Sequence, residues 1–317
     1  SLWGDARPRK SRRNLEVDPV VNQRKAYIYA IGAVLIWSTV ASAFKLSLRT
    51  LSPAHLLLYA NLVSVLLLGV ILLFRRELGM ALPTNRQQWL HSAGLGILNP
   101  FLYYLVLFKA FDLLPAQEAQ PLNYTWAITL SLLAVPLLKQ KLSLREILAI
   151  MVSYSGVLVI STRGDLLAMN FSDPLGVALA LGSTVAWALY WIFNVRDSRP
   201  PLAGLFMNFL CALPLILIYC LLFTEMQVPD LSGLLGAAYI GCFEMGISFL
   251  LWLQALKYTA SAARISSLIF ISPFFSLILI YFLVGEEILA STFYGLVLIV
   301  AGLVLQQFLK KQSHDVD

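Results

Sequence analysis

Two polar side chains stand in the middle of long apolar runs. Glu244 lies within GCFEMGISF, and Asn99 lies within GILNPFLYY. An ionised carboxylate inside such a run costs about 3 kcal/mol, so it persists only where it faces a cavity, is paired or is protonated. We therefore predict that Glu244 binds a proton or a substrate amine near the midplane. The alternative is a protonated, hydrogen-bonded structural group.

Prolines interrupt several of these runs. Pro100 has no amide hydrogen and leaves the carbonyl of Gly96 free, and later prolines act in the same way. Free carbonyls at membrane depth need protein or water as partners. For the prolines, the alternative to a function is an ordinary kink packed against neighbouring helices. For Arg264, the alternative to a gating role is an anchor at the cytoplasmic side. The predicted coupling and gating residues are Glu244, Arg264, Pro100, Pro121 and Pro273.

The segment PAQEAQPLNYTW is the most polar of the apolar runs. Glu118 stands near its start, where a carboxylate favours the helix N-terminus, so we expect it to reach water. Asn123 lies deeper and needs a partner. Both are candidates for the wall of a substrate route.

Aromatic side chains also fall in mid-run, among them Trp37, Tyr103 and Trp187. A cavity lined by such rings suits an organic solute with apolar or ring character. Core packing is the alternative for each ring. The predicted cavity residues are Trp37, Ser38, Asn61, Asn99, Tyr103, Glu118, Asn123, Tyr124, Trp126, Trp187, Tyr190, Asn208, Glu244 and Ser248.

The composition indicates that lipid is the solvent. Of 317 residues 59% are hydrophobic and 13% are charged, with a mean hydropathy of +0.78, whereas soluble domains are about 25% charged. The three cysteines lie in apolar runs and form no CxxC, and HExxH, GxSxG and Walker patterns are absent. The sequence thus predicts a polytopic membrane protein that is not an enzyme, with no metal and no cofactor.

Ten runs are long enough to cross a bilayer as helices, and they lack the alternation of barrel strands. They cover residues 27–47, 53–74, 88–110, 115–138, 144–162, 174–195, 201–223, 232–256, 260–284 and 289–309. We therefore expect an all-α fold with a basic cytosolic tail at 1–26, a first five-helix repeat at 27–165, a second at 166–309, and a cytosolic tail at 310–317.

The net charge is +6, and its basic residues are sorted between the two sides of the membrane. They do not form a patch of the kind that binds nucleic acid. Nineteen lysines and arginines fall on the side of the N-terminus, and Lys45, Arg49, Lys109 and Arg163 fall on the other. The positive-inside rule then predicts that both termini are cytoplasmic.

The chain repeats itself at a shift of about 145 residues, which aligns Gly96 with Gly241 and Asn99 with Glu244. Trp37 also matches Trp187, and Asn61 of LYAN matches Asn208 of LFMN. An odd number of helices in each half makes the second half an inverted copy of the first. Inverted repeats with interrupted helices are typical of secondary transporters.

The strings IWST, WALYW, LWLQALKY and ISPFFSLILIYFLVGEEI resemble the EamA family of the drug/metabolite transporter superfamily, over about residues 27–309. The segment EAQPLNYTWAITLSLL is similar to the fourth helix of the bacterial aromatic amino-acid exporters. That resemblance implies that Glu118, Asn123, Tyr124 and Trp126 face the substrate route, and that the fifth and tenth helices are peripheral. The chain departs from the family at KQKL, residues 139–142, where the second half has GEEI, and at Asn61, where many members carry arginine.

These observations predict a secondary transporter in a bacterial inner membrane that works by alternating access. We expect an exporter of amino acids or related metabolites, driven by a proton gradient or by substrate exchange. Its expected partners are a small-molecule substrate and the bilayer. The alternatives are nucleotide sugars, drugs or lipid-like amphiphiles as substrates, a receptor or assembly subunit that transports nothing, and an intramembrane hydrolase. The sequence leaves the oligomeric state open.

Overall fold

The computed structural model describes residues 22–139, 142–167, 171–194, 197–259, 265 and 267–314, with side chains up to residue 309. Arg264, one of the predicted gating residues, lies outside these ranges, as do residues 1–21 of the predicted N-terminal tail. The described residues form helices and connecting turns, with no strand among them. The all-α prediction is confirmed.

The first half contains α1 (Gln23–Ser47), α2 (Pro53–Phe74), the short α3 (Leu78–Ala81), α4 (Arg86–Gly96), η1 (Ile97–Leu102), α5 (Tyr103–Leu113), α6 (Ala116–Tyr124), α7 (Trp126–Leu138) and α8 (Leu144–Ser161). The second half contains α9 (Pro174–Asn194), α10 (Pro201–Phe223), α11 (Leu231–Tyr239), η2 (Ile240–Ile247), α12 (Ser248–Tyr258), η3 (Leu268–Ile271), α14 (Ser272–Leu279), η4 (Ile280–Val284) and α15 (Ala290–His314).

Nine stretches of the described chain are long and apolar enough to span a membrane. They correspond to nine of the ten predicted runs, with α4, η1 and α5 joined as Arg86–Leu113 and α11, η2 and α12 joined as Leu231–Tyr258. The remaining run, predicted at 260–284, is described as the shorter apolar helix Leu268–Val284. The chain is therefore an integral membrane protein.

Local sequence signals set several helix starts. Pro53 and Pro201 occupy the first turns of α2 and α10, where their missing amide hydrogens cost nothing. Ser143 and Glu146 form a capping box at the start of α8, with each side chain bonded to the other residue's backbone amide. These signals set where the spans begin after the turns that connect them.

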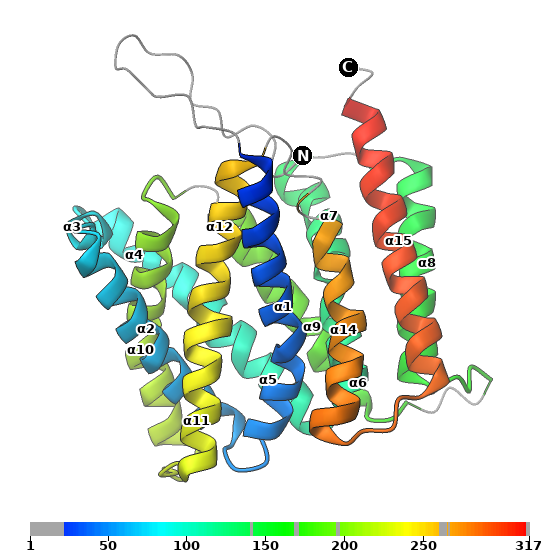
Figure 1. The fold of residues 1–317 in the computed structure, drawn as a ribbon, viewed down its shortest axis with the longest axis horizontal. Coiled ribbons are helices and arrows are strands. Elements are labelled where there is room, and N and C mark those ends of the chain that lie inside the picture. The colour runs from blue at the N-terminus through cyan, green and yellow to red at the C-terminus, as the bar shows by residue number, and fades with distance from the viewer. Residues whose placement is uncertain are drawn as a thin grey trace.

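The two halves run in opposite directions through the bundle (Figure 1). Gln23, where α1 begins, and Leu309, near the end of α15, lie at one end, which we call the terminal end. The opposite end, the distal end, carries the connections 48–52, 114–115, 224–230 and 285–289. α1 runs from the terminal to the distal end and α9 runs back, as inverted repeats require.

Glycines let the halves cross closely and reciprocally. A Cβ on Gly96 of the first half would lie 2.4 Å from the carbonyl oxygen of Asn208 in α10. A Cβ on Gly241 of the second half would lie 2.4 Å from the carbonyl oxygen of Ala60 in α2. Small residues at such crossings let helices approach within a membrane. Each half thus inserts its interrupted helix against the second helix of the other.

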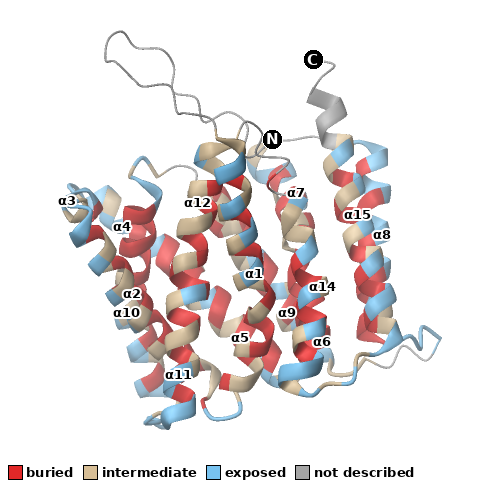
Figure 2. Ribbon diagram, viewed as in Figure 1, coloured by how far each residue is buried: buried red, intermediate tan, exposed pale blue. Residues whose placement is uncertain are grey.

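α8 and α15 form a separate pair at one side of the bundle (Figure 1). Gly302 of α15 faces Ser153 and Ala149 of α8, and Gly156 faces the backbone of Gly295. Figure 2 shows buried residues along the seam of this pair and exposed residues on its outer faces. This arrangement agrees with the peripheral position that the resemblance implies for the fifth and tenth helices.

Candidate functional site

Glu244 lies on η2, a π-helical stretch of eight residues that interrupts the eighth span. Such wide turns often occur at functional sites, because they turn a side chain away from regular helical packing. The residue is 9% exposed. Its Oε1 accepts a hydrogen bond of 3.1 Å from the hydroxyl of Tyr104, while its Oε2 has no partner among the described residues. One carboxylate oxygen therefore remains available to a proton or a ligand.

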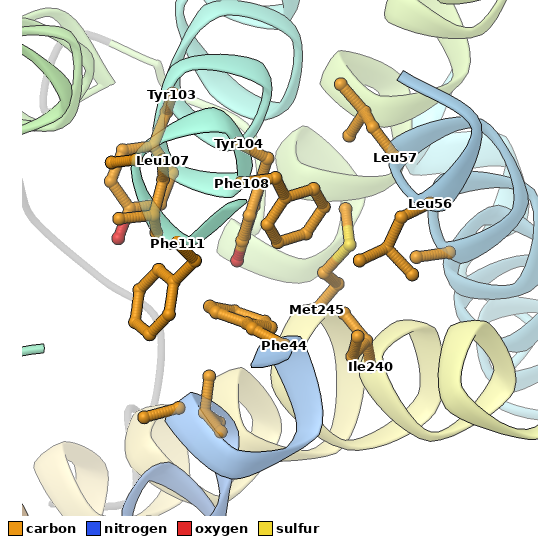
Figure 3. Close-up of a cluster of buried hydrophobic side chains, with 14 of the residues drawn as sticks. Phe44, Leu56, Leu57, Tyr103, Tyr104, Leu107, Phe108, Phe111, Ile240 and Met245 are labelled. Carbon is orange, nitrogen blue, oxygen red and sulfur yellow. The ribbon is translucent and has the colours of Figure 1, made fainter. Parts of the chain in front are cut away.

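Tyr104 is held firmly by apolar neighbours. It is fully buried, with its ring 6.5 Å from that of Phe44 and 5.4 Å from that of Phe108. Figure 3 shows it beside these two rings and Met245. A hydroxyl on so constrained a ring fixes the orientation of the Glu244 carboxylate at low entropic cost.

Trp187 of α9 is the centre of an aromatic cluster drawn from both halves. Its ring centroid lies 4.5 Å from Tyr103, 5.9 Å from Tyr190 and 6.5 Å from Trp126. Tyr103 in turn lies 4.8 Å from Tyr104. A continuous chain of ring contacts therefore leads from the Glu244 partner to α9.

Trp37, the repeat partner of Trp187, packs on the other half in the same manner. Its ring lies 5.2 Å from that of Trp252 in α12. Nearby on α1, the hydroxyl of Ser38 donates to the carbonyl of Val34 at 2.7 Å and contacts the hydroxyl of Ser272 at 3.3 Å. The structure thus brings the first and ninth spans together at this level.

The third span breaks at Asn99, whose φ of −145° and ψ of 116° are not helical. The break predicted at Pro100 is therefore present. The side chains of Asn99 and of Asn208 in α10 are fully buried, and none of their amide atoms forms a hydrogen bond within the described chain. The hydroxyl of Tyr190 lies close to both amides. Asn61, by contrast, donates to the carbonyl of Phe209 at 3.1 Å.

The fourth span is interrupted at Thr125, between α6 and α7, one turn after Pro121. Asn123, expected to need a partner, has two: its Oδ1 lies 3.4 Å from the Tyr103 hydroxyl, and its Nδ2 donates to Ser183 at 3.1 Å. Tyr124 of the same turn lies near Ser272. Pro273 stands in the first turn of α14, directly after the 3₁₀ turn η3.

Glu118 does not reach water, so the expectation of a solvated carboxylate is wrong. Its side chain is 0% exposed, forms an ion pair of 2.9 Å with the Nε of Arg163, and accepts a hydrogen bond from Ser172. The turn after α8 folds over the start of α6, so an arginine that is itself half exposed neutralises the buried carboxylate. The two acids among the predicted cavity residues therefore differ: Glu118 is paired with a cation, and Glu244 is not.

A polar network joins the two halves at the distal end. Glu286 accepts hydrogen bonds from the backbone amides of Ala116 and Gln117, at 2.7 and 3.1 Å. The Gln117 side chain bonds to Glu287, Leu289 and Thr292. A carboxylate at a helix N-terminus is favoured by the unpaired amides and by the helix dipole.

Lys45 of α1 and Arg49 of the turn that follows it extend this network. The Nζ of Lys45 donates to the carbonyls of Phe111 and Leu114, both at 2.7 Å. Arg49 donates to the carbonyl of Val284 at 2.8 Å. These bonds tie the first span to the ends of the third and ninth spans at the distal end.

The terminal end carries a surface pocket. A pocket of about 310 Å³ lies there, lined by Arg75, Glu77, Pro200, Pro201, Leu202, Leu250, Leu253, Gln254 and Lys257. Beside it, Asp197 forms a buried pair of 2.7 Å with Arg199, which also donates to Ser92. Burial alone would raise the pKa of Asp197, but the hydrogen bonds and charge of Arg199 outweigh it and lower the pKa below its ordinary value.

The sequence did not point to several residues of this site. Tyr104 is one of many aromatics in an apolar run, and nothing in its spacing marks it as the partner of Glu244. Glu286 lies in the GEEI string, but its position there did not indicate a function for it. A signal for Glu286 existed, because Ala116 and Gln117 begin a helix whose N-cap is proline and therefore has no capping side chain.

Comparison with known proteins gives a consistent result. The profile of the EamA-like transporter family matches residues 24–162 and 174–306. Uncharacterized transporters of Archaeoglobus fulgidus and Clostridium kluyveri are 23% and 24% identical, over 89% and 92% of this chain and 96% of each relative. The aromatic amino acid exporter YddG of Ancylobacter novellus is 24% identical over 75% of this chain and 81% of its own length. A crystal structure that is 21% identical shares the fold, with a TM-score of 0.65 over 92% of this chain and 99% of the other.

Proposed function

The chain belongs to the EamA-like transporter family, and on that premise we propose that it exports amino acids or related small metabolites by alternating access. The observation that carries this proposal is the Glu244 carboxylate, which is nine-tenths buried at a break in its span and has one oxygen without a partner. Such a group titrates or binds a cation, because an unpaired buried charge is otherwise too costly. The name of the Ancylobacter relative supports amino acids as the substrate class.

Alternating access requires two ends that open in turn. The distal network of Glu286, Gln117, Lys45 and Arg49 supports a closed distal gate, and the pocket beside Arg75 and Lys257 supports a looser terminal end. The reciprocal crossings of the two halves supply a symmetry by which the opposite state can form. Glu244 then loads a proton or a substrate ammonium from one side and releases it to the other.

The orientation follows from the placement of basic residues. Those at the described terminal end outnumber those at the distal end, which favours a cytoplasmic terminal end and cytoplasmic chain termini in a bacterial inner membrane. The terminal-end group is Arg24, Lys25, Arg75, Arg76, Arg86, Lys139, Arg145, Arg199 and Lys257, and the distal group is Lys45, Arg49, Lys109 and Arg163.

The direct test is exchange of labelled amino acids, aromatic and small neutral ones side by side, in proteoliposomes of the pure protein. We expect saturable exchange that Glu244→Gln slows at least tenfold and makes insensitive to pH, because the amide cannot ionise. Glu118→Gln is the matched control, since it makes the same chemical change at the paired carboxylate. That variant lowers thermal stability and leaves the pH profile of exchange unchanged.

The outcomes separate the parts of the proposal. An unchanged rate and pH profile in Glu244→Gln would remove the role of Glu244. No exchange across the amino-acid panel, with exchange of nucleotide sugars or amphiphiles instead, would refute the substrate class and leave the transporter. A protein that exchanges nothing and co-purifies with one partner would instead be a receptor or an assembly subunit.

A further inference from the structure

The packing of the helices leaves the buried side-chain amides of Asn99 and Asn208 without hydrogen-bond partners in the described chain. They come from η1 of the first half and α10 of the second, at the crossing that Gly96 makes close. Both residues are 0% exposed, and all four side-chain nitrogen and oxygen atoms are without hydrogen bonds in the described chain. A buried polar group without a partner costs about 1–3 kcal/mol. Two such amides at one crossing therefore indicate a ligand.

Tyr190 completes this cluster from α9, with its hydroxyl close to both amides. Three neutral donors, two amide groups and one hydroxyl, then converge from three spans. Lys45 and Arg199 form hydrogen bonds or ion pairs with other groups. No cation of the described chain forms a hydrogen bond or an ion pair with the three donors. Donors of this kind suit a carboxylate whose charge is balanced within its own molecule. A phosphate would call for arginine or lysine.

The cluster is linked to Glu244 by aromatic rings. Tyr104, which binds the Glu244 carboxylate, contacts Tyr103, and Tyr103 contacts Trp187, which contacts Tyr190. One end of this chain thus offers an anionic oxygen and the other offers neutral donors. Three ring contacts, with centroids 4.8, 4.5 and 5.9 Å apart, separate the two ends, so the carboxylate and the ammonium of one α-amino acid, which share a carbon, do not reach both ends at once.

We propose that Asn99, Tyr190 and Asn208 form the subsite that binds the carboxylate of the transported solute. This inference rests on the proposed function, and it narrows the substrate class to solutes that carry a carboxylate. The subsite rejects amines that lack a carboxylate, because they leave its donors without a partner. A carboxylate bound by both amides also holds the third and seventh spans together, because Asn99 lies on the third span and Asn208 on the seventh.

The test compares L-phenylalanine with 2-phenylethylamine, which has the same ring and amine but no carboxylate. Proteoliposomes of the parent protein should transport phenylalanine with a kcat/KM at least tenfold above that of the amine. Asn208→Leu keeps the number and branching of the side-chain heavy atoms and removes the donors, and Tyr190→Phe removes only a hydroxyl. Each should lower kcat/KM for phenylalanine about tenfold, the effect of losing one hydrogen bond to a charged group, and leave the amine within about twofold.

Asn61→Leu is the matched control, because Asn61 is the repeat partner of Asn208 and its amide is already bonded to a carbonyl. It should change transport of both compounds by the same factor. A parent protein that transports both compounds, with a ratio that Asn208→Leu and Tyr190→Phe leave unchanged, overturns the subsite and leaves the proposed function standing. A parent protein that transports no amino acid refutes both.

Discussion

Glu286 offers the sharpest test of the distal gate, because one carboxylate of the second half caps the first turn of α6 in the first. Its two oxygens accept from the amides of Ala116 and Gln117 at 2.7 and 3.1 Å. In Glu286→Gln one oxygen remains, and the new NH₂ group faces an N–H donor. One charge-assisted hydrogen bond is lost and the other becomes neutral. Since charge-assisted bonds contribute about 1.5–3 kcal/mol and neutral ones about 1 kcal/mol, the closed state loses roughly 2 kcal/mol after allowance for the partial exposure of Glu286.

A loss of about 2 kcal/mol raises the ratio of open to closed distal ends about thirtyfold. The assay uses a cysteine at Ser42, which is 1% exposed on α1, one turn from Lys45 toward the middle of the bundle. Cys211, Cys220 and Cys242 are first replaced by alanine. A membrane-impermeant maleimide added at the distal side then reports how often that end opens.

We expect labelling of the Ser42→Cys reporter to be about thirtyfold faster with Glu286→Gln than with Glu286. Glu287→Gln is the matched control, because it makes the same change on the neighbouring residue, whose contribution to the network is its backbone carbonyl. Labelling in Glu286→Gln no faster than in Glu287→Gln would refute the gate. Rapid labelling with Glu286 present would show that the distal end is not closed.

Two further predictions concern packing and pH. Gly96→Ala places a methyl group against the Asn208 carbonyl and should lower stability by about 1–3 kcal/mol. Gly94→Ala, with nothing within 4 Å of the new methyl group, should leave stability unchanged or raise it by up to about 1 kcal/mol, the gain in helix propensity, so equal melting temperatures for the two variants would contradict the close crossing. Asp197→Asn, which leaves Arg199 buried without its anion, should cost about 3 kcal/mol at neutral pH. Because the folded pKa of Asp197 is lowered, its stabilisation is present above the unfolded value of about 3.9 and is lost as pH falls through the folded value. The loss of stability between pH 5 and pH 3 should therefore be smaller in Asp197→Asn than in the parent, as thermal unfolding in detergent at each pH would show.

The sequence alone determined the class of the protein and much of its plan. Hydropathy, run length and the shift of about 145 residues are local or periodic properties, so they predicted membrane spans and two inverted repeats before any contact was known. The cost of a carboxylate in lipid singled out Glu244 for the same reason, since that cost depends only on the neighbours in the chain. The break at Pro100 followed from the missing amide hydrogen.

Only the tertiary structure decided which partners the polar groups have. Tyr104 meets Glu244 across 140 residues of sequence, and Glu286 meets the start of α6 across 170. Glu118 looked solvated because a first-turn acid usually is, but the turn that carries Arg163 folds over it. Asn61 and Asn208 are equivalent in the repeat, yet one amide is bonded and the other is not. Such differences arise from contacts between helices, and a pattern along one chain does not encode the distance between side chains that only folding brings together.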